Sequence, residues 1–215
     1  ARVVLGNRNP GEGEAIAAEI RAAGGQAVFR QTDVSRAADC AALVACTLDH
    51  FGRLDGAINN AGVMDAVFPG DPVDYASQKR LAMNPIHESS DEYWDVVMRV
   101  NATGVFKSLR AELRHMVAQG SGGSIVNVSS VAGLRGFGGT PSYVASKHAV
   151  TGLTKNAAID YAAYGIRVNS VHMANTATPM VDRAMELVRA KVKASGAPPG
   201  IGLAKTKSLL QYEDS

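Results

Sequence analysis

The order of hydrophobic patterns along the chain constrains its fold more than any other feature. Short runs of β-branched residues alternate with longer segments of helical period, as a parallel sheet with crossover helices requires. We expect strands over 3–5, 26–32, 54–59, 125–128 and 166–171. We expect helices over 11–23, from an N-cap at Ser35 to Phe51, and over 91–118 and 142–164. This order predicts a single α/β domain with a doubly wound, Rossmann-like parallel sheet in three αβα layers, whose ligands bind at the carboxyl ends of the strands.

Composition narrows the class of partner. The 215 residues are 46% hydrophobic and 20% charged, with a formal net charge of +2. That charge is too small to indicate a nucleic-acid or membrane surface, so we expect a small-molecule substrate. No apolar run reaches the roughly 18 residues of a membrane span, and no signal-peptide pattern is present. Cys40 and Cys46 fall on different sides of one expected helix, which fits a reducing cytoplasm. The histidine spacings predict no metal site.

The residues with the most chemical information are Tyr143, Lys147 and Ser130. The tyrosine and the lysine stand four apart in a helical segment, and the serine follows a strand. Spacing of i, i+4 places the phenol and the ammonium on one helix face. A neighbouring cation stabilises a phenolate and lowers its pKa from about 10, so that the phenol can exchange protons near neutrality. The pattern indicates an acid/base site at an alcohol or carbonyl carbon, and the alternative is a half-buried ring beside a solvated amine.

Several short strings resemble the short-chain dehydrogenase/reductase family. They are SIVNVSS at 124–130, YVASK at 143–147, NNAG at 59–62 and VNATG at 100–104, so the resemblance covers almost the whole chain. It implies that Ser130, Tyr143 and Lys147 form a catalytic tetrad with Asn101, which interrupts its helix and holds a water joined to the lysine. In the family Tyr143 is the acid/base group and the serine hydroxyl hydrogen-bonds the substrate oxygen.

The same resemblance implies a nicotinamide cofactor, NADP or NAD. Its expected contacts lie after successive strands and on the catalytic helix: Asn7, Arg8, Asp33, Val34, Asn60, Ala61, Gly62, Tyr143, Lys147 and Thr178. Cofactor choice rests on the end of the first strand, where an acidic residue would bind both ribose hydroxyls and repel a 2′-phosphate. Asn7 removes that repulsion and Arg8 can pair with the phosphate, which favours NADP. The alternative is a solvated Arg8 stacked near the adenine.

Two departures from the family pattern are visible. The sequence begins at the family's second strand, without the first strand and its glycine-rich turn, and 203–215 does not reach the last strand. We therefore expect a fragment, or a chain with its termini removed, in which the strands at Val3 and Ala57 each have an unpaired edge. After the fifth strand, the family's Pro-Gly is replaced by residues 172–175, His-Met-Ala-Asn, which puts the cofactor loop in doubt but not the acid/base group.

Two segments are expected on the substrate side. Residues 63–90 are too long for an unstructured loop and should carry structure of their own. Phe68, Tyr75, Met83 and His87 would form a lid or a wall near the substrate mouth, or else a subunit contact. Residues 173–215 correspond to the family's substrate-capping region. The resemblance also implies a homodimer or homotetramer.

Two functions compete at this point. The first is an NAD(P)-dependent oxidoreductase acting on a secondary alcohol or ketone. The second is a catalytically silent nucleotide-binding or scaffold protein with the same fold. The intact Ser130, Tyr143 and Lys147 favour the enzyme, and the absent glycine turn and Pro-Gly favour the silent protein.

Overall fold

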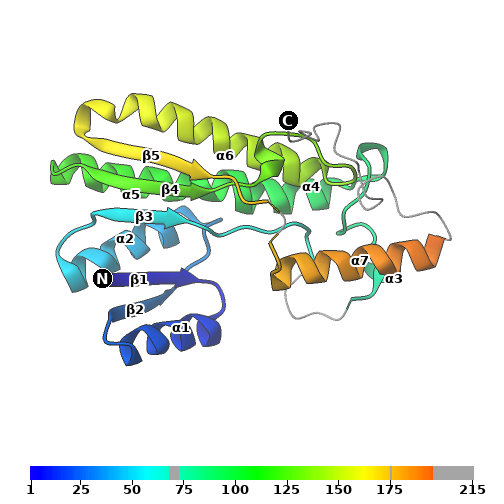
Figure 1. Ribbon diagram of the computed structural model, residues 1–215, viewed down its shortest axis with the longest axis horizontal. Helices are drawn as coiled ribbons and strands as arrows, with labels where there is room; N and C mark the ends of the chain where they lie inside the picture. The colour runs from blue at the N-terminus through cyan, green and yellow to red at the C-terminus, as the bar shows by residue number, and fades with distance from the viewer. Residues whose placement is uncertain (68–72, 175, 196–215) are drawn as a thin grey trace, which may run out of the picture.

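The computed structural model describes residues 1–67, 73–174 and 176–195, and it alternates strands with helices as expected (Figure 1). The strands are β1 (Arg2–Asn7), β2 (Gln26–Gln31), β3 (Gly56–Asn59), β4 (Gly123–Val128) and β5 (Ile166–Val171). The helices are α1 (Pro10–Ala22), α2 (Ala37–Phe51), α3 (Tyr75–Gln78), α4 (Asp91–Val97), α5 (Gly104–Gln119), α6 (Pro141–Asp160) and α7 (Pro179–Ser195). Shorter turns are η1 (Ile86–Glu88), η2 (Met98–Thr103), η3 (Val131–Gly133) and η4 (Ala162–Tyr164). The predicted Rossmann-like α/β class is confirmed.

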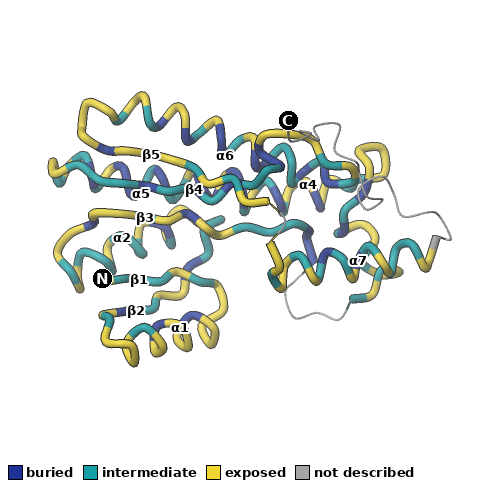
Figure 2. The backbone as a smooth tube through the Cα atoms, viewed as in Figure 1, coloured by how far each residue is buried: buried dark blue, intermediate teal, exposed yellow. Residues whose placement is uncertain are grey.

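The five described strands form two parallel sheets. β1 pairs with β2, and the other three follow the order β3-β4-β5. β1 and β3 do not pair with each other, so each has one hydrogen-bonded neighbour among the described strands, as the sequence predicted. Ile58 on β3 is 73% exposed, and Figure 2 shows exposed stretches along this strand.

Helices cover both faces of the first sheet. Gly13 of α1 approaches the Phe29 ring on β2 so closely that a Cβ on the glycine would lie 2.1 Å from it. On the other face, a Cβ on Gly6 of β1 would lie 2.8 Å from Leu43 of α2. α1 and α2 therefore sandwich β1 and β2, which gives the αβα layering at this end of the molecule.

The main apolar core lies between the second sheet and helices α5 and α6. Its fully buried members include Ile125 on β4, Met116 on α5 and Val150 on α6. Burying side chains of this size contributes about 1.5–3 kcal/mol each. This packing fixes α6, which carries the expected acid/base residues, against the sheet.

The predicted helix over 91–118 is interrupted. α4 ends at Val97, the backbone widens into the π-helical turn η2, and α5 resumes at Gly104. Asn101 lies inside η2, where the resemblance placed a helix interruption. Two large apolar side chains of this region are exposed, Trp94 at 44% and Phe106 at 45%, and Arg110 stacks over the Phe106 ring at 5.2 Å.

The expected N-cap at Ser35 is wrong. The cap position of α2 is Arg36, whose side chain makes no capping hydrogen bond. The backbone N–H of Ser35 donates instead to the Asp33 carboxylate at 2.9 Å, and the N–H of Asp33 donates to the Asp39 carboxylate at 3.0 Å. The turn after β2 is thus closed by two carboxylates, and the serine serves as a backbone donor.

The 63–90 segment carries local structure and packs against α7. Lys191 of α7 donates to the Asn84 side chain at 2.6 Å and lies 3.8 Å from Glu88. A small cavity between the two segments is lined by Tyr75, Ala82, Met83, Leu187, Val188 and Lys191. Phe68 lies outside the described residues, and so do residues 196–215 after α7. Within the described ranges, no helix is long and apolar enough to span a membrane.

Candidate active site

The phenol of Tyr143 and the hydroxyl of Ser130 meet at the carboxyl end of β4. Tyr143 lies in the first turn of α6, and Ser130 caps η3 by accepting a hydrogen bond from the Ala132 N–H at 3.1 Å. The two hydroxyl groups lie close enough for the serine to influence the titration of the phenol. Burial raises the pKa of Tyr143 above its usual value, and the neighbouring Ser130 hydroxyl offsets that rise only in part. The phenol is therefore protonated at neutral pH in this structure.

Lys147 lies over the Tyr143 ring. Its Nζ is 5.6 Å from the ring centroid and donates to the Val128 carbonyl at 2.9 Å. Burial lowers the pKa of the ammonium to about 8. The expected net lowering of the Tyr143 pKa is not found, because burial of the phenol dominates and the Lys147 ammonium faces the ring and the end of β4.

Asn101 and Gly62 complete the surroundings of the lysine. The Asn101 side chain donates to the Val63 carbonyl at 2.8 Å and to Ser146 at 3.0 Å, and it accepts from the Val63 N–H at 2.8 Å. A Cβ added to Gly62 would lie 3.3 Å from the Asn101 oxygen and 3.6 Å from the Lys147 Nζ. A glycine at this position lets the turn after β3 approach both groups. The structure therefore brings all four expected catalytic residues into one cluster.

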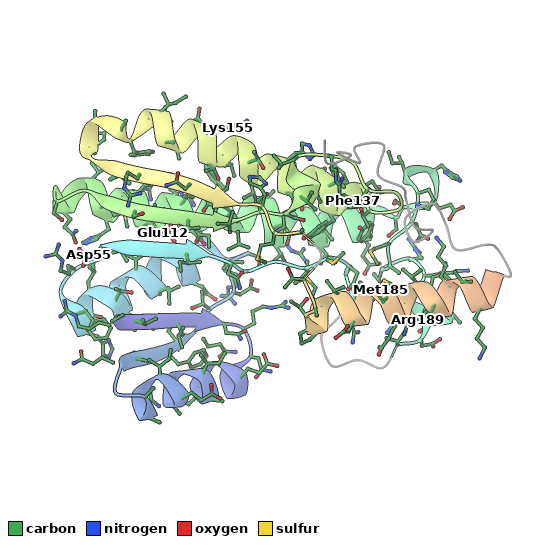
Figure 3. The ribbon with its side chains drawn as sticks, in the orientation of Figure 1. Asp55, Glu112, Phe137, Lys155, Met185 and Arg189 are labelled. Atoms are coloured by element: carbon green, nitrogen blue, oxygen red, sulfur yellow. The ribbon has the colours of Figure 1, made fainter. Side chains whose placement is uncertain are left out.

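A buried polar chain runs beneath this cluster and was not foreseen from the sequence. The Asn59 amide donates to Glu112 at 3.1 Å and to Asn127 at 2.9 Å, and Asn127 donates to Thr154 at 2.9 Å. It ties α5, β3, β4 and α6 together, and Figure 3 labels Glu112. The signal was available, because a glutamate at position 112 falls among the buried positions 109, 113 and 116 of α5.

The titration of Glu112 predicts a pH-dependent stability. Burial raises its pKa from 4.5 to about 7, and the Asn59 amide opposes that rise. Between these values the folded protein binds more protons than the unfolded chain, so this residue's stabilising contribution is present at low pH and is lost as the pH rises. The loss amounts to about 3 kcal/mol. Glu112→Gln keeps an acceptor for Asn59 but cannot ionise.

We therefore expect the free energy of unfolding of Glu112→Gln, relative to that of the wild type, to rise by about 3 kcal/mol as the pH increases from about 5 to about 8. Urea unfolding of both proteins across this range measures the difference. A free-energy difference that does not change with pH would show that Glu112 does not titrate in this window.

The expected cofactor residues gather at the carboxyl ends of β1, β2 and β3. Asn7 and Arg8 end β1, Asp33 and Val34 follow β2, and the turn 60–62 follows β3. Asn60 and Ala61 are exposed and accessible to a ligand. Val34 packs against Gly104, where an added Cβ would lie 2.8 Å from its side chain.

Asp33 and Arg8 lie within electrostatic reach of each other. Burial raises the pKa of Asp33, but the hydrogen bonds from Ser35 and the charges of Arg8 and Arg36 outweigh it and leave the pKa below its usual value. The carboxylate is thus ionised at neutral pH and can accept a hydrogen bond from an adenine amino group. Arg8 is exposed, and its backbone carbonyl accepts from the Gln31 side chain at 3.0 Å.

The Lys147 ammonium has free hydrogen-bond donors that suit the hydroxyl groups of a ribose. Of the three hydrogens on its buried ammonium, one goes to Val128, and among the described residues no other acceptor bonds to it. Two donors thus remain for hydroxyl groups brought in by a ligand.

The remaining candidates lie apart from the cluster. Thr178 precedes α7, and its hydroxyl accepts from the Val181 N–H at 3.3 Å. His148 is exposed and hydrogen-bonds the Val144 carbonyl at 2.9 Å. His87 is exposed beside Glu88, at 3.4 Å. Both cysteines are free. No group of three or more metal-ligating side chains occurs in the described ranges.

Comparison with known proteins agrees with this fold and cluster. The family model described as short chain dehydrogenase matches residues 1–188. The chain is 40% identical over 202 residues to a 3beta-hydroxysteroid dehydrogenase of Mediterraneibacter gnavus, covering 93% of this chain and 67% of the relative. It is 40% identical over 186 residues to a 2,5-dichloro-2,5-cyclohexadiene-1,4-diol dehydrogenase of Sphingobium indicum, covering 86% and 67%.

A solved structure shares the fold as well. The crystal structure of levodione reductase superposes with a TM-score of 0.77 at 34% identity, covering 89% of this chain and 69% of that one. An α/β domain that clusters a serine, a tyrosine and a lysine at the ends of parallel strands is the architecture of a nucleotide-dependent oxidoreductase. The chain belongs to the short-chain dehydrogenase/reductase family.

Proposed function

We propose that the protein is an NAD(P)-dependent oxidoreductase that interconverts a secondary alcohol and a ketone, with Tyr143 as its acid/base group. One observation supports this above others. The phenol lies beside the Ser130 hydroxyl and under the Lys147 ammonium, while Asn101 and Gly62 line the same place. Family membership supports the same reaction class.

In the reducing direction Tyr143 donates its proton to the carbonyl oxygen of the substrate. The raised pKa suits this role, because the phenol is protonated at neutral pH. Ser130 donates a hydrogen bond to the same oxygen as negative charge develops on it. The Lys147 ammonium stabilises the phenolate that remains. A bound nicotinamide cofactor supplies or accepts the hydride.

For alcohol oxidation, Tyr143 must first lose its proton. Because burial holds its pKa high, oxidation should accelerate as the pH rises, whereas reduction should not. Asn101 acts on this step indirectly, since it fixes the turn after β3 beside the lysine.

The first experiment is a reductase assay. The purified protein with NADPH or NADH and a panel of ketones should consume the reduced cofactor, as followed by its absorbance. Turnover with at least one ketone is the expected result. Cofactor binding without turnover across a broad panel would favour a catalytically silent protein, which the replacement of Pro-Gly by residues 172–175 also favours.

The cofactor would lie across the ends of the three strands. Lys147 and Tyr143 would hold the nicotinamide ribose, Asn60, Ala61 and Gly62 the adenine ribose, Asp33 and Val34 the adenine, and Thr178 the carboxamide. Asn7 carries no charge and Arg8 is exposed at the end of β1, an arrangement that accepts a 2′-phosphate. NADP is therefore the favoured cofactor.

Arg8→Ala tests this preference. If the guanidinium pairs with a 2′-phosphate, its loss should weaken NADPH binding by about tenfold and leave NADH binding nearly unchanged. Dissociation constants from cofactor fluorescence measure both. Arg36→Ala is a matched control, since Arg36 also lies near Asp33. Equal losses for both cofactors would assign Arg8 to adenine stacking.

The substrate side would be built by residues 63–90 and 173–215. Met83 packs, as Tyr143 does, against the apolar cluster of Ala66, Tyr93 and Val97, and it also lines the cavity against α7, so it is placed to form a wall. The named relatives act on a hydroxysteroid and a cyclohexadiene diol, which supports a ring-borne hydroxyl as the substrate class. Assembly as a homodimer or homotetramer belongs to the same proposal.

A further inference from the structure

His172 makes a direct contact with the backbone of Ser130. Its Nδ1 lies 3.0 Å from the Ser130 carbonyl oxygen, and its Nε2 lies 3.0 Å from the Ser170 hydroxyl. The histidine stands just after β5, where the sequence departs from the family's Pro-Gly. Family resemblance gives it no role.

The two partners determine which ring nitrogen carries the hydrogen. A carbonyl oxygen can only accept, so Nδ1 donates to Ser130. In the neutral ring Nε2 then accepts from the Ser170 hydroxyl. Both nitrogens are satisfied by one tautomer, which fixes the plane of the ring.

The backbone holds the two segments side by side beyond the last strand pair. The Ser129 N–H donates to the Val171 carbonyl at 2.9 Å, and the Val131 N–H donates to the Met173 carbonyl at 3.0 Å. These bonds flank the His172 contact. The Ser130 carbonyl also accepts from the Gly133 N–H at 2.8 Å, so His172 supplies the second of its two hydrogen bonds.

We propose that His172 is a positioning residue that fixes the Ser130 peptide and thereby holds the Ser130 hydroxyl in place beside Tyr143. The inference rests on the proposed role of Ser130. The hydroxyl accepts a hydrogen bond from the Ala132 N–H and lies beside the Tyr143 phenol, so a rotation of the Ser130 backbone would break that bond and move the hydroxyl away from the phenol. Misplacing a group that contacts the reacting oxygen lowers the rate without weakening cofactor binding.

Three substitutions separate this role from simple stabilisation. His172→Ala removes both contacts. In His172→Asn the amide nitrogen takes the place of Nδ1 and can still donate to Ser130. In His172→Gln the amide lies farther out, near the position of Nε2, and cannot. Ser130→Ala and the double variant of Ser130→Ala with His172→Ala complete a cycle.

The expected result is a fall of about tenfold in kcat for His172→Ala, with the KM for the cofactor unchanged. His172→Asn should recover most of the rate and His172→Gln should not. His172→Ala should add nothing in the Ser130→Ala background, because the histidine acts through the serine.

Wild-type kcat in His172→Ala alongside a slow Ser130→Ala would overturn the inference and leave the proposed function standing. An equal further loss in the Ser130→Ala background would also overturn it. Wild-type rates in both Ser130→Ala and Tyr143→Phe would remove the proposed function itself.

Discussion

Tyr143→Phe is expected to lower kcat by at least about a hundredfold while leaving cofactor binding intact. General acid catalysis by a positioned side chain contributes about 10²–10⁴ in rate, and phenylalanine has no proton to give. The ring itself is part of a buried cluster with Tyr93 and Val97, and phenylalanine preserves that packing. The fold should therefore survive. Steady-state kinetics with the best ketone, together with a cofactor titration, measures both halves of the prediction.

Tyr164→Phe is the matched control. Tyr164 lies in η4 after the same helix and is 53% exposed, so removing its hydroxyl should change neither kcat nor binding. A Tyr143→Phe protein that turns over at the wild-type rate would exclude the phenol as the proton donor. Comparable losses in both variants would indicate a general effect of the substitution and would contradict the assignment equally.

The fold was predictable because its elements are decided locally. The alternation of β-branched runs with segments of helical period predicted all five described strands. The predicted end of the second helix at Phe51 is also correct, since Gly52 follows it as the cap of α2 with a φ of 75°. The errors lie where tertiary contacts override local preference. Ser35 is a good N-cap residue, yet Asp33 accepts from its N–H and Asp39 accepts from the N–H of Asp33, so the turn closes differently.

The candidate site was predictable for a different reason. Short strings at the ends of strands identified Ser130, Tyr143 and Lys147, and parallel topology brings such ends together. Glu112 and His172 were missed because their partners come from distant elements: Glu112 meets Asn59 of β3, and His172 meets a backbone carbonyl that no side-chain pattern reveals. The Tyr143 pKa was misjudged because i, i+4 spacing fixes the face of a helix but not which atom of the ring the ammonium approaches.

Lys147→Met is expected to abolish turnover and to stabilise the protein at the same time. Burial lowers the pKa of the ammonium from 10.5 to about 8, so at neutral pH the charged group destabilises the fold by roughly 3 kcal/mol. Methionine fills a similar space without a charge but loses the bond to Val128, worth about 1 kcal/mol. The free energy of unfolding of Lys147→Met should therefore exceed that of the wild type by about 2 kcal/mol at pH 7.

The sign of the pH dependence distinguishes this effect from better packing. The folded protein releases its Lys147 proton near pH 8 and the unfolded chain only near 10.5, so the wild type recovers stability as the pH rises through this window. The advantage of Lys147→Met should therefore shrink above about pH 8. Lys155→Met, at an exposed position of the same helix (Figure 3), should show neither the gain in stability nor the loss of activity.

A less stable Lys147→Met protein would mean that the ammonium is well solvated or paired, which would contradict the buried site. A more stable variant that kept its activity would show that α6 holds the lysine for no catalytic purpose. If Lys147→Met is more stable and inactive, the buried ammonium beside Tyr143 lowers the stability of the fold and is needed for turnover, as expected of a catalytic group.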